Sequence, residues 1–460
     1  MERTLWPFLL AFGLAVFSFS PSASSQSAVN GQLAFQAMTF EDCIQYAMQN
    51  NPNLQQVKLD EVAGEYQVKE VRASGLPQAS LSGRYTDNFA LPTQLLPGEI
   101  IGQPGTTVPV QFGVRHGLYA GLEVNQLLFS KSYFTGLKAA EAARGLYQAN
   151  TLMAKENLVY NIAQLYLQLQ ITDKQKEILN ANLGRVVQLI GITEAQLQEG
   201  LIKKVDVDQL RVNRTNLETE IQSLDINYGQ QLSLLKYYMG MPMDTPMQIV
   251  GLEEAELEYP LSQGLNLQYN TTLRQLQKQE ELTGLELQSV KDGYFPVLSA
   301  FASYNWQGQS DKLFSKENKV NTFGSGMWGL SLSIPVFDGF QKKFKAQQIE
   351  VSQRQLALQS RQVANQTQME FHNATEQLRQ SRSLISQQEK NMQLAEELYS
   401  ITKLSYQEGV APLTELLNAE TSLKEAQTQY LTATLQQKLA ELGHLKTSGE
   451  LARLIEAGSK

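Results

Sequence analysis

The chain has 460 residues and a formal net charge of −8, and its lysine and arginine residues are scattered along the sequence. This charge balance excludes a nucleic-acid-binding protein, because no basic stripe is present to neutralise phosphates. Beyond the N-terminus there is no run of about 18 uncharged apolar residues, which excludes a polytopic helical membrane protein as well.

The N-terminus predicts export. Residues 5–19 are apolar, follow a single arginine and precede small polar residues, which is the pattern of a secretory signal peptide. We therefore expect residues 1–25 to be removed; a short buried N-terminal helix is the alternative. The single cysteine, Cys43, cannot form an internal disulfide, and we expect it to be a small residue on a helix face.

Long helices are predicted next. Thr39, followed three residues later by Asp42, is typical of a capping box and predicts a first helix. Residues 132–200 contain no proline and repeat apolar residues every three or four positions, which predicts a coiled-coil helix about 100 Å long at about 1.5 Å per residue. A second seam spans residues 217–235, and Gly240 would end that helix. The first seam consists of Leu158, Ile162, Leu165, Leu169, Leu179, Leu183, Val186 and Ile190.

Four segments alternate apolar and polar residues with a period of two, as a β-strand with two different faces does. They lie at 76–85, 117–128, 295–304 and 327–335. Half-buried strands of soluble sheets alternate too, but about ten alternating residues also suit a transmembrane strand. The predicted lipid-facing residues are Leu122, Val124, Leu298, Leu330 and Leu332, and the predicted water-facing ones include Glu123, Ser331 and Ser333.

Four strands cannot close a barrel alone. Backbone groups in lipid must all be paired, and known single-chain barrels have about eight strands or more. Three copies would supply twelve strands. We therefore expect a homotrimer in which each chain contributes four strands to a shared twelve-stranded β-barrel in membrane lipid.

The same order of predicted helices and strands occurs twice along the chain. Three pairs of matching residues lie 219 positions apart: Asn51 and Asn270, Pro77 and Pro296, and Tyr85 and Tyr304. Two later pairs lie 208 and 209 positions apart: Phe129 and Phe337, and Gly200 and Gly409. The offset changes across residues 86–116 and 305–326, which we expect to be loops. The sequence thus predicts two structural repeats, 38–250 and 260–450, followed by a C-terminal tail at 451–460.

These motifs together resemble the TolC-type outer-membrane efflux family over about residues 38–450. The stretches that carry the resemblance are MTFEDCIQYAMQNNPNL, the pair LPQASLSGRY and FPVLSAFASY, LSLSIPVFDGF, and the two helix breaks EGLIKKVDVDQL and EGVAPLTELLNA. The resemblance implies a mainly α, internally duplicated fold, in which a coiled-coil helical tube crosses the periplasm and a trimeric twelve-stranded barrel spans the outer membrane.

The resemblance also implies that the two helix breaks are hairpin tips at the far periplasmic end, where the family docks onto a periplasmic adaptor protein and closes as an iris. The adaptor-contacting positions are Gly200, Leu201, Gly409 and Val410, and the iris positions are Glu415, Asn418, Asp206 and Tyr406. From local sequence alone, Asp206 and Glu415 are equally well explained as acids that favour helix N-termini.

Two positions depart from the family pattern. Ala411 stands where a basic residue is usual, and Asn418 stands where a second acid is usual. The hypothesis that follows is that Lys203 or Lys204, on the neighbouring tip, reaches Glu415 instead.

No constellation for catalysis, a cofactor or a metal ion is predicted. The histidines, His116, His372 and His444, are far apart and are expected on the surface or on helix faces. The GSGMWG stretch at 324–329 precedes a strand rather than a helix, so it is not a dinucleotide-binding loop. We therefore expect a protein that is not an enzyme.

The predicted function is a passive exit duct for small molecules, coupled through an adaptor to an inner-membrane transporter. A duct for secreted polypeptides, as in type I secretion, is the nearer alternative. An exported coiled-coil scaffold with a small soluble sheet is the more distant one.

Overall fold

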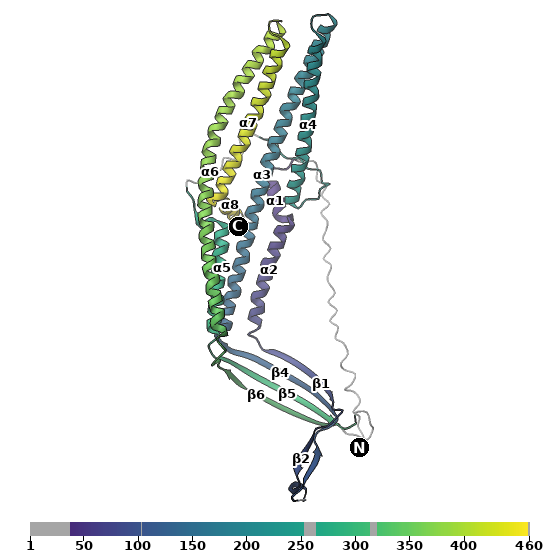
Figure 1. Ribbon diagram of the computed structural model, residues 1–460, viewed down its shortest axis with the longest axis vertical. Coiled ribbons are helices and arrows are strands. Elements are labelled where there is room, and N and C mark those ends of the chain that lie inside the picture. The colour runs from purple at the N-terminus through teal and green to yellow at the C-terminus, as the bar shows by residue number, and fades with distance from the viewer. Residues whose placement is uncertain (1–36, 103, 253–263, 313–319, 459–460) are drawn as a thin grey trace.

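The computed structural model describes residues 37–102, 104–252, 264–312 and 320–458. Figure 1 shows an elongated chain in which long helices run side by side at one end, a curved sheet lies at the other, and a two-stranded arm extends beyond the sheet. The predicted signal peptide lies outside the described residues.

The first half of the chain contains helices α1 (Phe40–Asn50) and α2 (Pro52–Ala73), strands β1 (Gln78–Asp87) and β2 (Thr93–Pro97), the 3-10 turn η1 (Gly98–Ile101), strands β3 (Thr107–Gln111) and β4 (His116–Ser130), and helices α3 (Lys131–Gln198) and α4 (Lys204–Met239). The second half contains the 3-10 turn η2 (Leu267–Tyr269), helix α5 (Thr271–Asp292), strands β5 (Val297–Ser310) and β6 (Asn321–Ser333), and helices α6 (Gln341–Gln407), α7 (Leu413–Ser448) and α8 (Glu450–Gly458).

The two halves share one plan. Helices α2, α3 and α4 have 22, 68 and 36 residues, and their counterparts α5, α6 and α7 have 22, 67 and 36. The predicted internal duplication and the long helix expected from 132 to 200 are therefore confirmed. None of the helices within the described ranges is both long and apolar enough to cross a membrane.

The matching asparagines of the repeat cap corresponding helices. The Asn51 side chain accepts a hydrogen bond from the Leu54 N–H at 2.8 Å, and the Asn270 side chain accepts one from the Leu273 N–H at 2.9 Å. Each bond satisfies a donor that the first helical turn leaves free. This requirement explains why the Asn-x-x-Leu pattern occurs in both halves.

The core follows the predicted seams. One cluster joins α1, α3 and α4 around the middle of α3, and a second joins α3 and α4 to α7 nearer the hairpin tips. Of the eight residues of the first seam, all but Leu183 are buried, and Leu183 packs against the second cluster. Cys43 is fully buried on the helix face of α1, and this burial raises the pKa of its thiol to about 12.

The main sheet is antiparallel, with the strand order β1-β4-β5-β6. Strands β1 and β6 are its edges. Two predicted loops differ from the structure: β5 continues to Ser310 and β6 already begins at Asn321, and the segment 86–116 contains the separate hairpin β2–β3. The polar ends of β5 and β6 lack a hydrophobic pattern, but their backbones pair with each other and so remain in the ladder.

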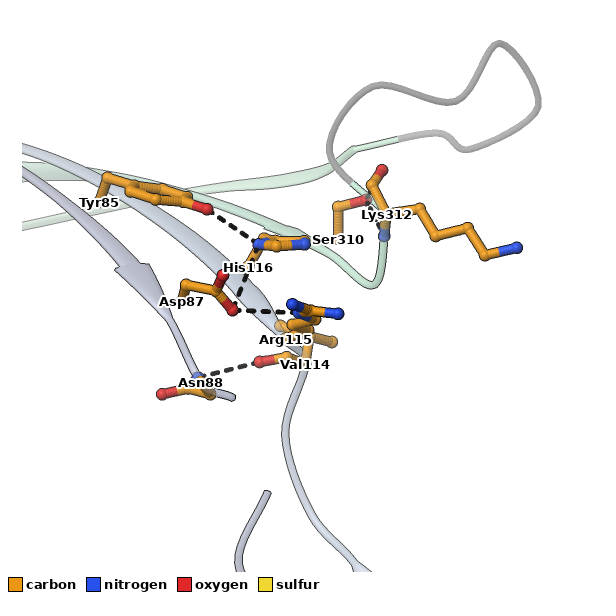
Figure 2. Close-up of polar contacts among 8 residues, drawn as sticks. All are labelled: Tyr85, Asp87, Asn88, Val114, Arg115, His116, Ser310 and Lys312. Carbon is orange, nitrogen blue, oxygen red and sulfur yellow. Dashed lines mark hydrogen bonds and ion pairs between the residues drawn. The ribbon is translucent and has the colours of Figure 1, made fainter. Parts of the chain in front are cut away.

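A cluster of polar side chains lies at the end of the sheet where the β2–β3 arm begins (Figure 2). The Tyr85 hydroxyl lies 3.0 Å from Nδ1 of His116, and Asp87 forms an ion pair with Arg115 at 3.1 Å. The Asn88 N–H donates to the Arg115 carbonyl at 2.7 Å. These contacts tie the two strands together at the point where the chain turns into the arm. His116, expected on the surface or on a helix face, is the first residue of β4, and its side chain is 12% exposed.

The C-terminal segment continues in helical form. Residues 451–458, predicted as the start of a tail, belong to α8, and Leu451 and Ala452 are buried. At the other end of the first half, Met38 pairs with Ile249 in an isolated parallel bridge, which brings the start and the end of that half together. We retain 38–250 and 260–450 as the proposed limits of the repeats, although residues 260–263 lie outside the described residues.

Candidate functional site

The two helix breaks are tight turns of the same geometry at the end of the molecule opposite the sheet (Figure 1). Gly200 and Gly409 have φ angles of 74° and 75°, which favour glycine. After each glycine an N–H reaches back to the helix, from Leu201 to the Gln196 carbonyl and from Val410 to the Ser405 carbonyl, both at 2.9 Å. Leu201 and Val410 are 73% and 81% exposed, so each tip presents an apolar side chain outward.

Tyr406 and Asp206 belong to different hairpins, Tyr406 near the end of α6 and Asp206 in the first turn of α4. Tyr406, near the end of α6, packs against the apolar cluster that includes Leu413. Burial raises the pKa of the Tyr406 hydroxyl, and the Asp206 charge raises it further. Asp206 also accepts a hydrogen bond from the Lys203 N–H at 3.2 Å, so it caps α4 as well. The two explanations of Asp206 are therefore compatible.

Glu415 and Asn418 lie on the exposed face of the first turns of α7, one turn apart, while Leu416 between them is buried. Within the described part of this one chain, no ion pair joins Glu415 to Lys203 or Lys204. The proposed replacement for the basic residue absent at Ala411 is thus not formed inside the chain. The hypothesis therefore now concerns contact between neighbouring chains, in which Lys203 or Lys204 of one copy would reach Glu415 of the next.

Sequence reasoning missed a polar cluster that joins the two hairpins below the tips. Arg185 of α3 donates to the Asn182 side chain, and its guanidinium lies 5.4 Å from the centroid of the Tyr399 ring of α6. Lys424 of α7 pairs with Glu220 of α4 at 3.1 Å. The four long helices each contribute at least one residue, and the cluster therefore joins the α3–α4 hairpin to the α6–α7 hairpin.

Glu420 of α7 is the buried acid of this cluster. It is 6% exposed, and one of its carboxylate oxygens has no hydrogen-bond donor among the described residues. Burial raises the pKa of the Glu420 carboxyl, and the charges of Arg185 and Lys424 partly oppose that effect. The desolvation of a buried carboxylate opposes its attraction to Arg185 and Lys424, and we expect desolvation to be the larger of the two here.

One signal in the sequence pointed to the cluster. Asn182 occupies a seam position between Leu179 and Val186 and is 1% exposed, so a polar residue interrupts the apolar stripe there. The partners on α6 and α7 lie more than two hundred positions further on, and no local pattern connects them to this position.

Substitution of Glu420 by glutamine is expected to raise the free energy of unfolding at pH 7 by about 1 kcal/mol, because a poorly paired buried charge is removed. The folded pKa is raised, so the native state holds this proton more tightly than the unfolded state. Wild-type stability therefore falls as pH rises from the ordinary glutamate pKa of 4.5 through the raised pKa of folded Glu420, and the gain of the variant should vanish below that ordinary value.

Urea unfolding followed by far-UV circular dichroism at both pH values would measure this difference, with the exposed Glu415→Gln on the same helix as the matched control. A Glu420→Gln variant that is less stable than the wild type at pH 7 would show instead that the carboxylate attracts Arg185 and Lys424 strongly enough to hold the hairpins together.

The strand register places the five predicted lipid-facing residues on one face of the sheet. Leu122 lies opposite Leu81 and Tyr304, and Leu298 lies opposite Leu332. Directly paired residues of antiparallel strands project to the same side, and residues two positions apart along a strand do as well. The same face also carries Val124, Leu330, Trp306 and Trp328, whereas Glu123, Ser80, Ser303 and Ser331 lie on the other.

The remaining titratable groups were predicted to bind no metal ion, and the three histidines were expected on the surface or on helix faces. No group of three or more histidine, cysteine, aspartate or glutamate residues in the described ranges is arranged to hold a metal ion. His444 is buried on α7 beside the Phe371 ring, with 5.2 Å between ring centroids, and His372 lies on α6.

An open four-stranded sheet with one apolar face, continued by two long helical hairpins, is the architecture of outer-membrane channel proteins. The family model described as outer membrane efflux protein matches residues 43–238 and 264–445. The chain belongs to this outer membrane efflux protein family. It is accordingly a protein of the outer membrane with a long periplasmic extension, and members of this family are channels rather than enzymes.

Individual relatives agree with this assignment. The chain is 24% identical to the outer membrane protein TolC of Salmonella enteritidis over 456 residues, covering 94% of this chain and 83% of that protein. Its fold matches the crystal structure of CusC with a TM-score of 0.72 at 18% identity, over 90% of this chain and 92% of the other. The CmeC outer membrane channel of Campylobacter jejuni matches with a TM-score of 0.72 at 14% identity, over 92% and 89%.

Proposed function

We propose that three copies of this chain form the passive outer-membrane exit duct of a tripartite efflux system for small molecules. The observation that carries the proposal is the open sheet, whose edges β1 and β6 are both unpaired in the described chain. Unpaired backbone groups cannot remain in lipid. Because four antiparallel strands alternate in direction, β6 of one copy would meet β1 of the next in the antiparallel sense, and three copies would close an even-numbered ring.

The outer faces of the helices support lateral association. Large apolar side chains are exposed along α4 and α6 of the single chain, where a solitary coiled coil would carry polar residues. They include Val205, Val212, Ile226 and Tyr237 on α4, and Leu358, Leu394, Leu398, Ile401 and Leu404 on α6. Packing of α4 and α6 against neighbouring copies would cover these side chains and enclose a water-filled tube.

The hairpin tips would serve as the inner end of the duct. Leu201 and Val410, held outward by Gly200 and Gly409, would contact a periplasmic adaptor protein, through which an inner-membrane transporter supplies cargo and energy. Glu415 and Asn418 of the three copies would line the iris, and Asp206 with Tyr406 would hold it shut. Opening would separate the hairpins as rigid bodies. The proposed duct performs no catalysis.

Small molecules are the proposed cargo. One relative, 23% identical over 96% of this chain, bears the name toluene efflux pump outer membrane protein TtgF, from Pseudomonas putida. A duct for secreted polypeptides is the alternative cargo class. Deleting the gene in the native organism is expected to raise sensitivity to small toxic compounds; loss of a secreted polypeptide with unchanged sensitivity would favour the alternative.

The native mass of the protein extracted from outer-membrane fractions in mild detergent tests the assembly. A stable particle of three chains is expected. A monomer, or a protein that stays in solution without detergent, would contradict the closed barrel and favour a coiled-coil scaffold.

A further inference from the structure

The connection between β6 and α6 exposes an unusual number of apolar side chains at the boundary of sheet and helices. Strand β4 passes directly into α3 at Ser130, but seven residues, 334–340, separate β6 from α6. Ile334 and Val336 continue the alternation of Leu332 beyond the end of the strand, and both are exposed. The apolar face of the sheet therefore extends past the last paired residue.

Phe340 is held in a conformation that glycine favours. Its φ is 66°, and among the described residues every other residue with a positive φ is a glycine. A bulky side chain is strained there. Phe340 is nevertheless 54% exposed, so packing within the chain covers only part of its side chain. The exposed part of this strained side chain is available for a contact outside the chain.

Lysine side chains accompany these aromatic rings. Lys343 Nζ lies 5.6 Å from the centroid of the Phe340 ring, and Lys342 Nζ lies 5.2 Å from that of Tyr294. Phe337 packs edge-on against Phe340 with 5.5 Å between centroids. Together these side chains line a cleft of about 290 Å³.

The cleft carries a net positive charge. Lys342 is paired with Asp338 at 3.0 Å, whereas Lys343 has no acidic partner within the described ranges. Lys345, two residues further along α6, is also exposed and has none there. An ammonium group and the Tyr294 ring at the level where strands end match the chemistry of a lipid headgroup region, where tyrosine is enriched and lysines attract anionic lipids, and the two phenylalanine rings add apolar surface for acyl chains.

We propose that this cleft binds a phospholipid with an anionic headgroup in the periplasmic leaflet of the outer membrane, with Lys343 contacting the phosphate and Phe340 and Phe337 contacting the upper part of the acyl chains. The proposal rests on the proposed membrane face of the sheet. A neighbouring copy of the chain is the other candidate occupant, and the experiment separates the two.

The experiment uses the full-length protein in mild detergent and native mass spectrometry with added dioleoyl phosphatidylglycerol or dioleoyl phosphatidylcholine. The wild type is expected to bind phosphatidylglycerol more tightly. Lys343→Gln should lower that affinity about fivefold, equivalent to about 1 kcal/mol for one lysine near a charged lipid, and leave phosphatidylcholine binding unchanged. Lys390→Gln, an exposed lysine of α6 in the helical region, is the matched control and should change neither.

Phe340→Gly separates binding from folding. Glycine relieves the backbone strain, so the thermal midpoint of the lipid-free protein should stay the same or rise, while the affinity for both lipids falls about fivefold. Equal binding of the two lipids by the wild type, or an unchanged preference in Lys343→Gln, would overturn the proposal. If Phe340→Gly dissociated the assembly but left lipid binding intact, the cleft would be an interface between copies. The mass of the lipid-free particle reports the trimer independently.

Discussion

Arginine at both Leu122 and Leu330 is expected to prevent the chain from assembling in the outer membrane. Both residues lie on the apolar face of the sheet, but at different depths. Leu122 lies in the middle of β4, opposite Leu81 and Tyr304, whereas Leu330 lies close to the end of β6 that leads to α6.

The depth decides the size of the loss. An arginine that faces lipid costs about 2–4 kcal/mol at the bilayer midplane and about 0–1 kcal/mol near the interface. Leu122→Arg should therefore account for most of the effect. In a trimer the cost is incurred three times, on the order of 10 kcal/mol, which equals the whole stability of a typical domain.

The measurement is the amount of trimer in outer-membrane fractions, separated on native gels. The double variant Ser303→Arg and Ser331→Arg places the same charges on the opposite face of the same sheet and should assemble normally, because that face is predicted to meet water. Normal assembly of the leucine variants, or equal failure of both pairs, would show that the two faces are assigned wrongly.

Periodicity made the strands and seams predictable. A face of a strand or helix is fixed by residues two, three or four positions apart, so Leu122, Val124 and the seam of α3 were identified from their neighbours alone. The repeat added information, because Asn51 and Asn270 cap equivalent helices and each supports the interpretation of the other.

Contacts between distant segments were not predictable. Arg185 and Tyr399 belong to different hairpins, and their approach depends on how α3 and α6 pack along their length. The left-handed backbone conformation of Phe340 was not predictable either, because phenylalanine gives no local indication of positive φ. The β2–β3 arm, within a segment expected to be a loop, has short strands with proline in each, which weakens any strand pattern.

The contacts of the tip residues were not predictable from local sequence patterns either. Resemblance supplied Tyr406 and Asp206 as partners, and the Asp206 charge adds to the raised pKa of Tyr406 within one chain. Glu415 remains exposed, with its proposed neighbours on other copies. The proposed gating would therefore depend on two kinds of contact, one inside each chain and one between chains, and Glu420 lies at the interface between the hairpins of one chain.

Replacing Asp292 by alanine is expected to cause the largest loss of stability in the helical part, because it breaks a buried ionic contact between the two halves. Asp292 ends α5 and is 2% exposed. Its carboxylate accepts hydrogen bonds from Thr135 at 2.5 Å and from Gln288 at 2.8 Å, and it pairs with Lys131 at 3.1 Å. Thr135 and Lys131 lie in the first turns of α3, where the helices meet the sheet.

Removal of one partner of a buried charge pair costs about 3–5 kcal/mol. Lys131 is 41% exposed at its side chain and also lies over the Phe295 ring, so water can still reach its ammonium group. We therefore expect about 3 kcal/mol for Asp292→Ala in urea unfolding at pH 7. Asp60→Ala, at an exposed aspartate of α2, is the matched control and should change stability by less than about 0.5 kcal/mol.

The pH dependence gives a separate test of the ionic part of this contact. Burial alone would raise the pKa of the Asp292 carboxyl, but the hydrogen bonds from Thr135, Lys131 and Gln288 bring it below its ordinary value. A lowered folded pKa means that the stabilisation is fully present above the ordinary aspartate pKa and is lost as pH falls through the folded one. The difference in the free energy of unfolding between the wild type and Asp292→Asn should accordingly become smaller at acidic pH. If this difference in the free energy of unfolding stayed constant from neutral to acidic pH, shape and hydrogen bonding, and not charge, would join the two halves at this position.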